Sequence, residues 1–91
     1  MLIRSQDKRM IANFDNICTV SAFSEKDSED IYVEDGTGSL MVGRYSTKAK
    51  AMKVLDMIQE AYCKFMSVKN DDAWDGKESV FYMPEDSEVE V

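Results

Sequence analysis

The stretch RYSTKAKAMKVLDMIQEAY, residues 44–62, predicts the long helix around which the rest of this chain is organised. Ser46 or Thr47 can cap its start by accepting a hydrogen bond from a backbone N–H that has no partner within the helix. At about 100° per residue, apolar side chains recur on one side of the helix, and the pattern continues to Val68. We therefore expect one amphipathic helix that begins at this cap and ends near residue 68.

The apolar side of this helix is wider than a single sheet requires. Ala51, Leu55, Ile58, Tyr62 and Phe65 fall within about 80°, and the flanking residues widen the apolar arc to about 220°. A helix that packs on one sheet needs an apolar stripe of about 100° or a little more. We therefore expect either that the sheet curls around the helix or that a second surface, such as another copy of the chain, covers the excess. The flanking residues are Met52 and Met66 on one side and Val54, Met57, Ala61 and Val68 on the other.

The start of the helix carries Lys48, Lys50 and Lys53, although the positive end of the helix dipole favours acidic residues. As a nucleic-acid site this group is weak, because Lys48 and Lys53 lie about 140° apart around the helix and the chain as a whole is acidic. We expect no direct binding to nucleic acid. The interpretation that the sequence favours is an internal anion, supplied by the acidic C-terminal segment of this chain or of a second copy.

The net charge of −7 comes entirely from the last quarter of the chain. Residues 1–69 contain ten acidic and ten basic residues, whereas residues 70–91 contain eight acidic residues and one basic residue, Lys77. The final segment, PEDSEVEV, is too acidic and too poor in apolar side chains to pack by itself. We therefore expect residues 84–91 to form an extended or loosely ordered acidic tail, which carries Glu85, Asp86, Glu88 and Glu90.

The segments before and after the helix predict short strands. Apolar and β-branched runs occur at 2–4, 9–14 and 17–23, with polar turns between them. The segment IYVEDGTGSLMVGRY, residues 31–45, predicts a hairpin with its turn at Asp35-Gly36, and Gly43 indicates a bulge or a close approach by another backbone. VFYM, residues 80–83, predicts a last strand that Pro84 ends. The predicted fold is α+β: an antiparallel meander of four to five strands packed on the helix, with the final strand rejoining the sheet, as one domain at 1–83.

The two cysteines are interpreted as ordinary apolar side chains. Cys18 alternates with Val20 and Ala22 on the strand face that is predicted to lie under the helix. Cys63 falls at the border of the polar stripe of the helix. Their separation fits neither a redox pair nor a zinc half-site, so we expect two buried or half-buried residues. A redox or intersubunit disulfide is the alternative.

The sequence lacks the residues that most catalytic and metal sites use. It has no histidine, which is the commonest general base and metal ligand. EDGTGS, residues 34–39, lacks the Lys-Ser/Thr of a phosphate loop and leads into a strand. The acidic clusters at 27–30 and 71–75 do not follow the EF-hand pattern, and no carboxylate pair can be placed at the roughly 5–9.5 Å that a glycosidase-like hydrolase uses. We expect no enzyme activity, no metal and no cofactor, with Trp74 covering an edge of the core; stacking on a ligand is its alternative role.

Membrane association is not expected from the sequence. No segment approaches the roughly 18 consecutive apolar residues of a membrane span. The segment MLIRSQDKRM lacks the apolar stretch of a signal peptide. We therefore expect a cytoplasmic location.

Three stretches together resemble a family of short proteins encoded by Gram-positive, especially clostridial, bacteria and their prophages. They are MLIRSQDK, YSTKAKAMKVLDMIQEAY and VFYMPEDSEV. The family has no assigned activity, so the resemblance implies no catalytic residues. Similar sequences often have an acidic residue one or two positions after the helix cap, where this chain has Lys48 and Ala49. The resemblance therefore does not imply a shared role for the lysines.

The leading hypothesis is a non-enzymatic interaction module of a phage or mobile element that forms a homo-oligomer. It would bind an unidentified protein partner through the surplus face of the helix or through the acidic tail. The alternative is an acidic mimic of nucleic acid that blocks a DNA- or RNA-binding host protein. A mimic of a duplex needs about one rigidly held charge per 1.7 Å of axis, which a flexible tail does not provide.

Overall fold

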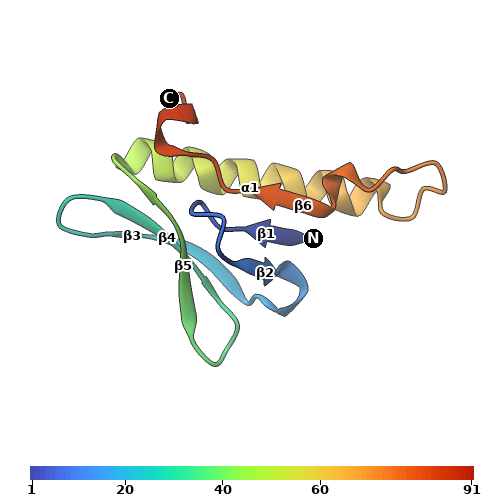
Figure 1. Ribbon diagram of the computed structural model, residues 1–91, viewed down its shortest axis with the longest axis horizontal. Helices are drawn as coiled ribbons and strands as arrows, with labels where there is room; N and C mark the ends of the chain where they lie inside the picture. Colours follow the sequence, from blue (N-terminus) through green and yellow to red (C-terminus); the bar gives the residue numbers. More distant parts are fainter.

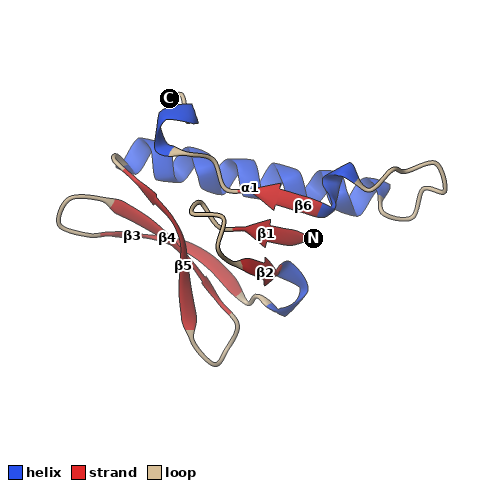
Figure 2. Cartoon of the chain, viewed as in Figure 1, coloured by secondary structure: helices blue, strands red, loops and turns tan.

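The computed structural model describes residues 1–91, which form two three-stranded sheets and one long helix (Figures 1 and 2). The predicted α+β class is confirmed. The strands are β1 (Leu2–Arg4), β2 (Ile11–Asn13), β3 (Thr19–Ser24), β4 (Glu29–Glu34), β5 (Ser39–Tyr45) and β6 (Val80–Tyr82). The helix is α1 (Lys48–Val68), and three short 3₁₀ turns are η1 (Phe14–Asn16), η2 (Lys77–Ser79) and η3 (Asp86–Glu88).

The six strands differ from the predicted arrangement, which was one meander of four to five strands with a final strand added to it. The strands β3, β4 and β5 form an antiparallel meander of their own. The other sheet has the order β2-β1-β6, with β1 antiparallel to β2 and parallel to β6. This second sheet joins the two ends of the chain, pairing Ile3 with Phe81. Short apolar segments do not indicate which strand they will pair with, so the sequence pattern did not separate the two sheets.

The helix α1 begins and ends where the sequence predicts. The side-chain oxygen of Thr47 accepts a hydrogen bond of 3.2 Å from the Lys50 backbone N–H, and the helix continues to Val68. This cap replaces one of the hydrogen bonds that the first turn of a helix lacks. No helix in the structure combines the length and the apolar composition needed to cross a membrane.

The core lies between α1 and the inner faces of both sheets. Ile3 of β1, Ile31 of β4 and Tyr45 of β5 are each no more than 1% exposed. The wide apolar arc of α1 therefore has a partial explanation within the chain, because two sheets supply side chains to the helix. The buried core residues are Met1, Ile3, Ile31, Val33, Val42, Tyr45, Ala51, Val54, Ile58, Met83 and Val89.

The turn of the β4–β5 hairpin forms at the predicted Asp35-Gly36 position. Gly36 has a φ of 93°, a conformation that glycine adopts without steric cost. The Asp35 carboxylate accepts hydrogen bonds from the backbone N–H groups of Thr37 (2.9 Å) and Gly38 (3.2 Å). Backbone conformation and side-chain bonding thus support the same turn.

Gly43 lies next to a bulge, one of the two alternatives predicted for it, and the atoms that approach it closely belong to side chains and not to another backbone. The pairing of β5 with β4 shifts by one residue between Ile31 and Tyr32, which places a bulge next to Gly43. A Cβ atom at Gly43 would lie 3.0 Å from Met83 Cε and 3.0 Å from a ring carbon of Tyr45. The missing side chain therefore makes room for two buried side chains of the core.

Residues 84–91 do not form the extended or loosely ordered tail that was predicted. Val89 is 5% exposed and belongs to the core, and the Glu85 backbone N–H donates a 2.7 Å hydrogen bond to the Glu88 carboxylate within η3. The C-terminus lies beside the N-terminal part of α1 (Figure 1). Composition alone indicated disorder because it does not count the apolar surface that the rest of the chain offers to Val89.

Candidate interaction surfaces

The acidic segment meets the start of α1 through Asp86. The Asp86 carboxylate accepts hydrogen bonds from the Ser46 backbone N–H (2.8 Å) and hydroxyl (3.1 Å), and it lies 3.4 Å from the Lys50 ammonium. Lys50 also donates a 2.9 Å hydrogen bond to the backbone oxygen of Asp86. The hydrogen bonds from Ser46, with the Lys50 charge, lower the pKa of Asp86 below its usual value. The anion at the basic helix start is thus a residue of the same chain.

The other charged residues that the sequence predicts at the helix start form no ion pairs with those of the acidic segment. Lys48 and Lys53 are exposed and belong to none of the ion pairs in the structure. Glu85, Glu88 and Glu90 are also exposed. Of the three lysines, only Lys50 therefore contacts the acidic segment.

Two residues that the sequence analysis did not identify form hydrogen bonds to Pro84, at the start of the acidic segment. The hydroxyl of the buried Tyr45 donates a 2.8 Å hydrogen bond to the Pro84 backbone oxygen, and the Gln6 side-chain amide donates one of 3.1 Å to the same oxygen. Burial raises the pKa of Tyr45, and the nearby carboxylates of Glu85 and Asp86 add to this effect. Nothing in the local sequence indicates these contacts, because the partners are 39 and 78 residues apart.

Trp74 lies beside Phe65, which in turn packs against the core. Its ring is half-buried and packs edge-to-face on Phe65 at 5.7 Å between ring centroids. Its indole N–H donates a hydrogen bond to the Glu78 carboxylate. The apolar ring and the polar N–H of Trp74 therefore both have partners within the chain.

Both cysteines are free and exposed, so the expectation of buried or half-buried side chains was wrong. Val20 and Ala22 do pack against the core, whereas Cys18 precedes the first residue of β3 and is exposed. Cys63 lies on the solvent side of α1. The alternation of a strand applies only within the strand, and its first residue was placed too early in the sequence.

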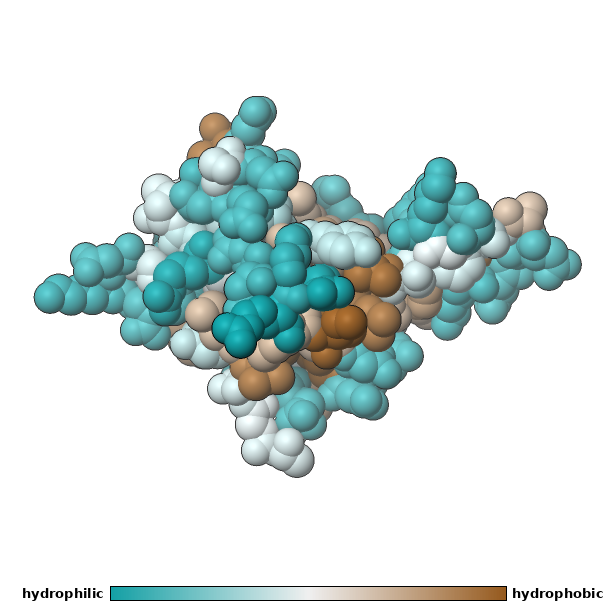
Figure 3. All heavy atoms as spheres, viewed as in Figure 1, coloured by the Kyte–Doolittle hydropathy of each residue, from teal (hydrophilic) through white to brown (hydrophobic).

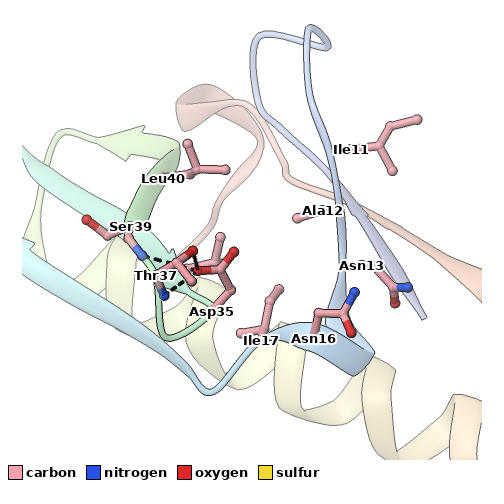
Figure 4. A pocket seen from close by; sticks show the side chains of 11 residues that line it. Ile11, Ala12, Asn13, Asn16, Ile17, Asp35, Thr37, Ser39 and Leu40 are labelled. Carbon is pink, nitrogen blue, oxygen red and sulfur yellow. Dashed lines mark hydrogen bonds between the residues drawn. The ribbon is translucent and has the colours of Figure 1, made fainter.

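A pocket of about 380 Å³ opens between the two sheets (Figure 4). Ile11–Asn13 of β2 form one side and the β4–β5 turn forms the other, with Asn16 and Ile17 between them. The lining includes one carboxylate, that of Asp35, whose pKa is lowered by hydrogen bonds from the Thr37 hydroxyl and backbone. Asp35 is therefore an ionised acceptor that serves the turn.

The outer face of the β2-β1-β6 sheet carries an apolar patch. Apolar atoms gather over β1 and β6 near the centre of Figure 3 and are bordered by hydrophilic atoms. In the strand register, Arg4 lies between the exposed side chains of Ile11 and Tyr82. The Lys8 ammonium lies 5.6 Å from the centre of the Tyr82 ring. Cations of the β1–β2 hairpin therefore already cover part of this patch.

One flank of α1 carries two exposed methionines and two half-buried apolar side chains, with an exposed glutamine between them. Met52 and Met66 are 47% and 44% exposed, Leu55 and Tyr62 are half-buried, and Gln59 is exposed. These five residues, which we name the α1 seam, follow one another at alternating steps of three and four residues. This spacing is the one by which one helix packs along another. The seam includes the two methionines that the sequence proposed as an interaction surface.

A groove of about 340 Å³ runs beside the α1 seam. Phe14 and Val20 form its far wall, and the Phe14 ring stacks on Tyr62 with ring centroids 4.8 Å apart. Val20 belongs to β3, which is an edge strand of its sheet. The groove therefore lies at a border of the fold, where a second molecule meets no further strand of this chain.

The sequence matches no protein-family model, no curated protein and no solved structure. Within the structure, no group of three or more histidine, cysteine, aspartate or glutamate side chains gathers in a way that would hold a metal ion.

Proposed function

We propose that this chain is a non-enzymatic interaction module that self-associates through the α1 seam. The phage or mobile-element setting is part of this proposal and rests on the sequence resemblance alone. The cytoplasmic setting is also part of it, and the two free cysteines agree with a reducing compartment. A further protein partner would bind the assembled oligomer.

The observation that carries the proposal is the exposure of the α1 seam. Four apolar side chains at helix-packing spacing stand along one flank of a 21-residue helix. Apolar side chains that gather along one flank of a folded chain mark an interaction site, whereas singly scattered apolar residues do not. The other flank of the helix differs because none of its apolar residues is exposed: Val54 is buried, and Met57, Ala61 and Val68 are half-buried.

The charges at the helix start support a protein partner over nucleic acid. Lys50 is already paired with Asp86, and Lys48 and Lys53 point in directions about 140° apart. Two isolated lysines on a chain of net charge −7 do not make the basic stripe that binds phosphates. Direct nucleic-acid binding is therefore no part of the proposal.

The mass in solution tests the proposal, measured by light scattering at low salt and at about 0.5 M salt, beyond the range of most surface charge interactions. We expect a dimer at both, since burial of an apolar seam does not weaken with salt. Met66→Glu should weaken the dimer by at least about tenfold, or about 1.4 kcal/mol. The matched control is Met41→Glu, which places the same charge at an exposed methionine of β5. A monomer at all concentrations, or equal weakening by both substitutions, would contradict the proposal.

A second candidate function, an acidic mimic of nucleic acid, is favoured by the fixed position of residues 84–91. Val89 in the core and Asp86 at the helix start hold Glu85, Glu88 and Glu90 at the surface. A mimic needs such fixed carboxylates. Hydrogen exchange tests this candidate: the amides of Glu85, Glu88 and Val89, which donate hydrogen bonds, should exchange slowly, and exchange at the rate of an unfolded peptide would remove the mimic from consideration.

A further inference from the structure

We propose that the second copy docks on the α1 seam with its helix antiparallel, across a two-fold axis that passes beside Gln59. This inference rests on the proposed self-association and adds the geometry of the pair. In a two-fold interface the same surface is used by both copies, so a contact from one residue to another occurs twice. The α1 seam meets this condition because its residues are similar on either side of Gln59.

Gln59 decides where the axis lies. It is the single polar residue of the α1 seam, and a buried amide without a hydrogen-bond partner is costly. A glutamine side chain carries both donors and an acceptor. When two copies of Gln59 face each other across a two-fold axis, each amide donates to the other. Tyr62 is the other seam residue with a polar group, but its ring is held against Phe14.

The apolar residues then match in pairs. With the axis at Gln59, Met52 lies opposite Met66 of the second copy, and Leu55 lies beside Tyr62 of the second copy. A shift of the axis along the helix by half a turn in either direction would instead set Lys48 or Lys69 against a methionine. The antiparallel register at Gln59 is therefore the one that keeps charge out of the α1 seam over its length of about 21 Å.

The charges at the two ends fit the same register. Lys48 lies four residues before Met52, in line with the α1 seam, is exposed and belongs to no ion pair within the chain. In the antiparallel pair it approaches residues 70–72 of the second copy, which include the exposed Asp71 and Asp72. A parallel pair would set Lys48 against Lys48. The antiparallel direction is therefore the one that brings carboxylates within reach of Lys48.

Disulfide cross-linking tests the position of the axis. In a Cys18→Ser, Cys63→Ser background, Gln59→Cys should form a disulfide-linked dimer under mild oxidation with copper phenanthroline. Two facing helices about 8–10 Å apart bring inward residues within the Cα separation of about 4.4–6.8 Å that a disulfide needs. The matched control is Glu60→Cys, which is equally exposed but turned by about 100° around the helix.

The outcomes separate the geometry from the self-association. We expect at least tenfold more cross-linked dimer for Gln59→Cys than for Glu60→Cys at a concentration where light scattering shows the dimer. A dimer that does not cross-link at position 59, or cross-links equally at both positions, would overturn the two-fold axis and leave self-association standing. A chain that stays monomeric by light scattering would overturn both.

Discussion

Asp30 and Arg44 face each other across β4 and β5 through two parallel hydrogen bonds, 3.0 Å from Arg44 Nε to Oδ1 and 3.1 Å from Nη2 to Oδ2. Asp30 is 1% exposed, whereas the Arg44 side chain is largely open to water. The Ser28 hydroxyl donates a third hydrogen bond of 2.9 Å to the same carboxylate. The hydrogen bonds from Arg44 are the main cause of the lowered pKa of Asp30, and the bond from Ser28 adds to it. The buried carboxylate therefore stays ionised at neutral pH.

The substitution Asp30→Asn should reduce the free energy of unfolding at pH 7 by about 1–3 kcal/mol, because it removes charge-assisted hydrogen bonds from a buried site. A lowered pKa in the folded state stabilises the protein above the unfolded value of about 3.9, and this contribution is lost as pH falls through the folded value. The difference between the two proteins should therefore shrink in acid. Urea unfolding from pH 7 to pH 3 measures it, with the exposed Asp27→Asn as control. Equal stability at pH 7 would contradict the role given to Asp30.

The substitution Gly43→Ala should destabilise the fold by about 1–3 kcal/mol, the cost of adding a methyl group to a filled core. The new Cβ would meet Met83 and Tyr45 at 3.0 Å, and Tyr45 cannot withdraw freely while its hydroxyl is bonded to Pro84. Thermal unfolding measures the effect. Gly38→Ala is the control, since nothing lies within 4 Å of its added Cβ, and it should change stability by no more than about 0.5 kcal/mol. A neutral Gly43→Ala would mean that the core rearranges there without cost.

The substitution Tyr45→Phe should cost about 0.5–1.5 kcal/mol, which is the net value of one hydrogen bond. The lower end is expected because the Pro84 oxygen keeps its hydrogen bond from Gln6. Denaturant unfolding gives the value. Tyr32→Phe serves as control because its hydroxyl makes no hydrogen bond within the chain, and a cost for Tyr32→Phe as large as that for Tyr45→Phe would remove the contact with Pro84 as the explanation.

The substitution Asp86→Asn should loosen residues 85–91 from the start of α1, seen as faster hydrogen exchange at the Ser46 and Val89 amides. The Ser46 amide donates to the Asp86 carboxylate and the Val89 amide to the Asp86 backbone oxygen. Because the pKa of Asp86 is lowered in the folded state, protection in the unaltered protein should persist above about pH 3.9 and fall in stronger acid, after correction for intrinsic exchange. The Asn variant should lack this change. Glu90→Gln removes one exposed charge as control and should leave both amides protected.

Local patterns predicted the elements whose interactions lie close together in sequence. The helix begins at Thr47 because its side chain reaches the Lys50 N–H three residues on, and the β4–β5 turn forms because Asp35 bonds to residues two and three positions later. The same patterns identified Met52 and Met66 as exposed parts of a wide apolar face. They did not identify Gln59, although it is the middle residue of the α1 seam when the seam is followed in steps of three and four residues.

What the sequence determined by itself is the helix with its cap and the hairpin turn, because each depends on contacts between near neighbours, and with them the α+β class. Only the tertiary structure decided that β6 pairs with β1, that Cys18 faces water, and that the acidic segment is ordered. These features depend on partners far apart in the chain, such as Gln6 with Pro84 and Ser46 with Asp86. The sequence of a short apolar segment, or a single polar side chain, does not indicate which distant residue it will contact. Only the packed core brings these partners within hydrogen-bonding distance.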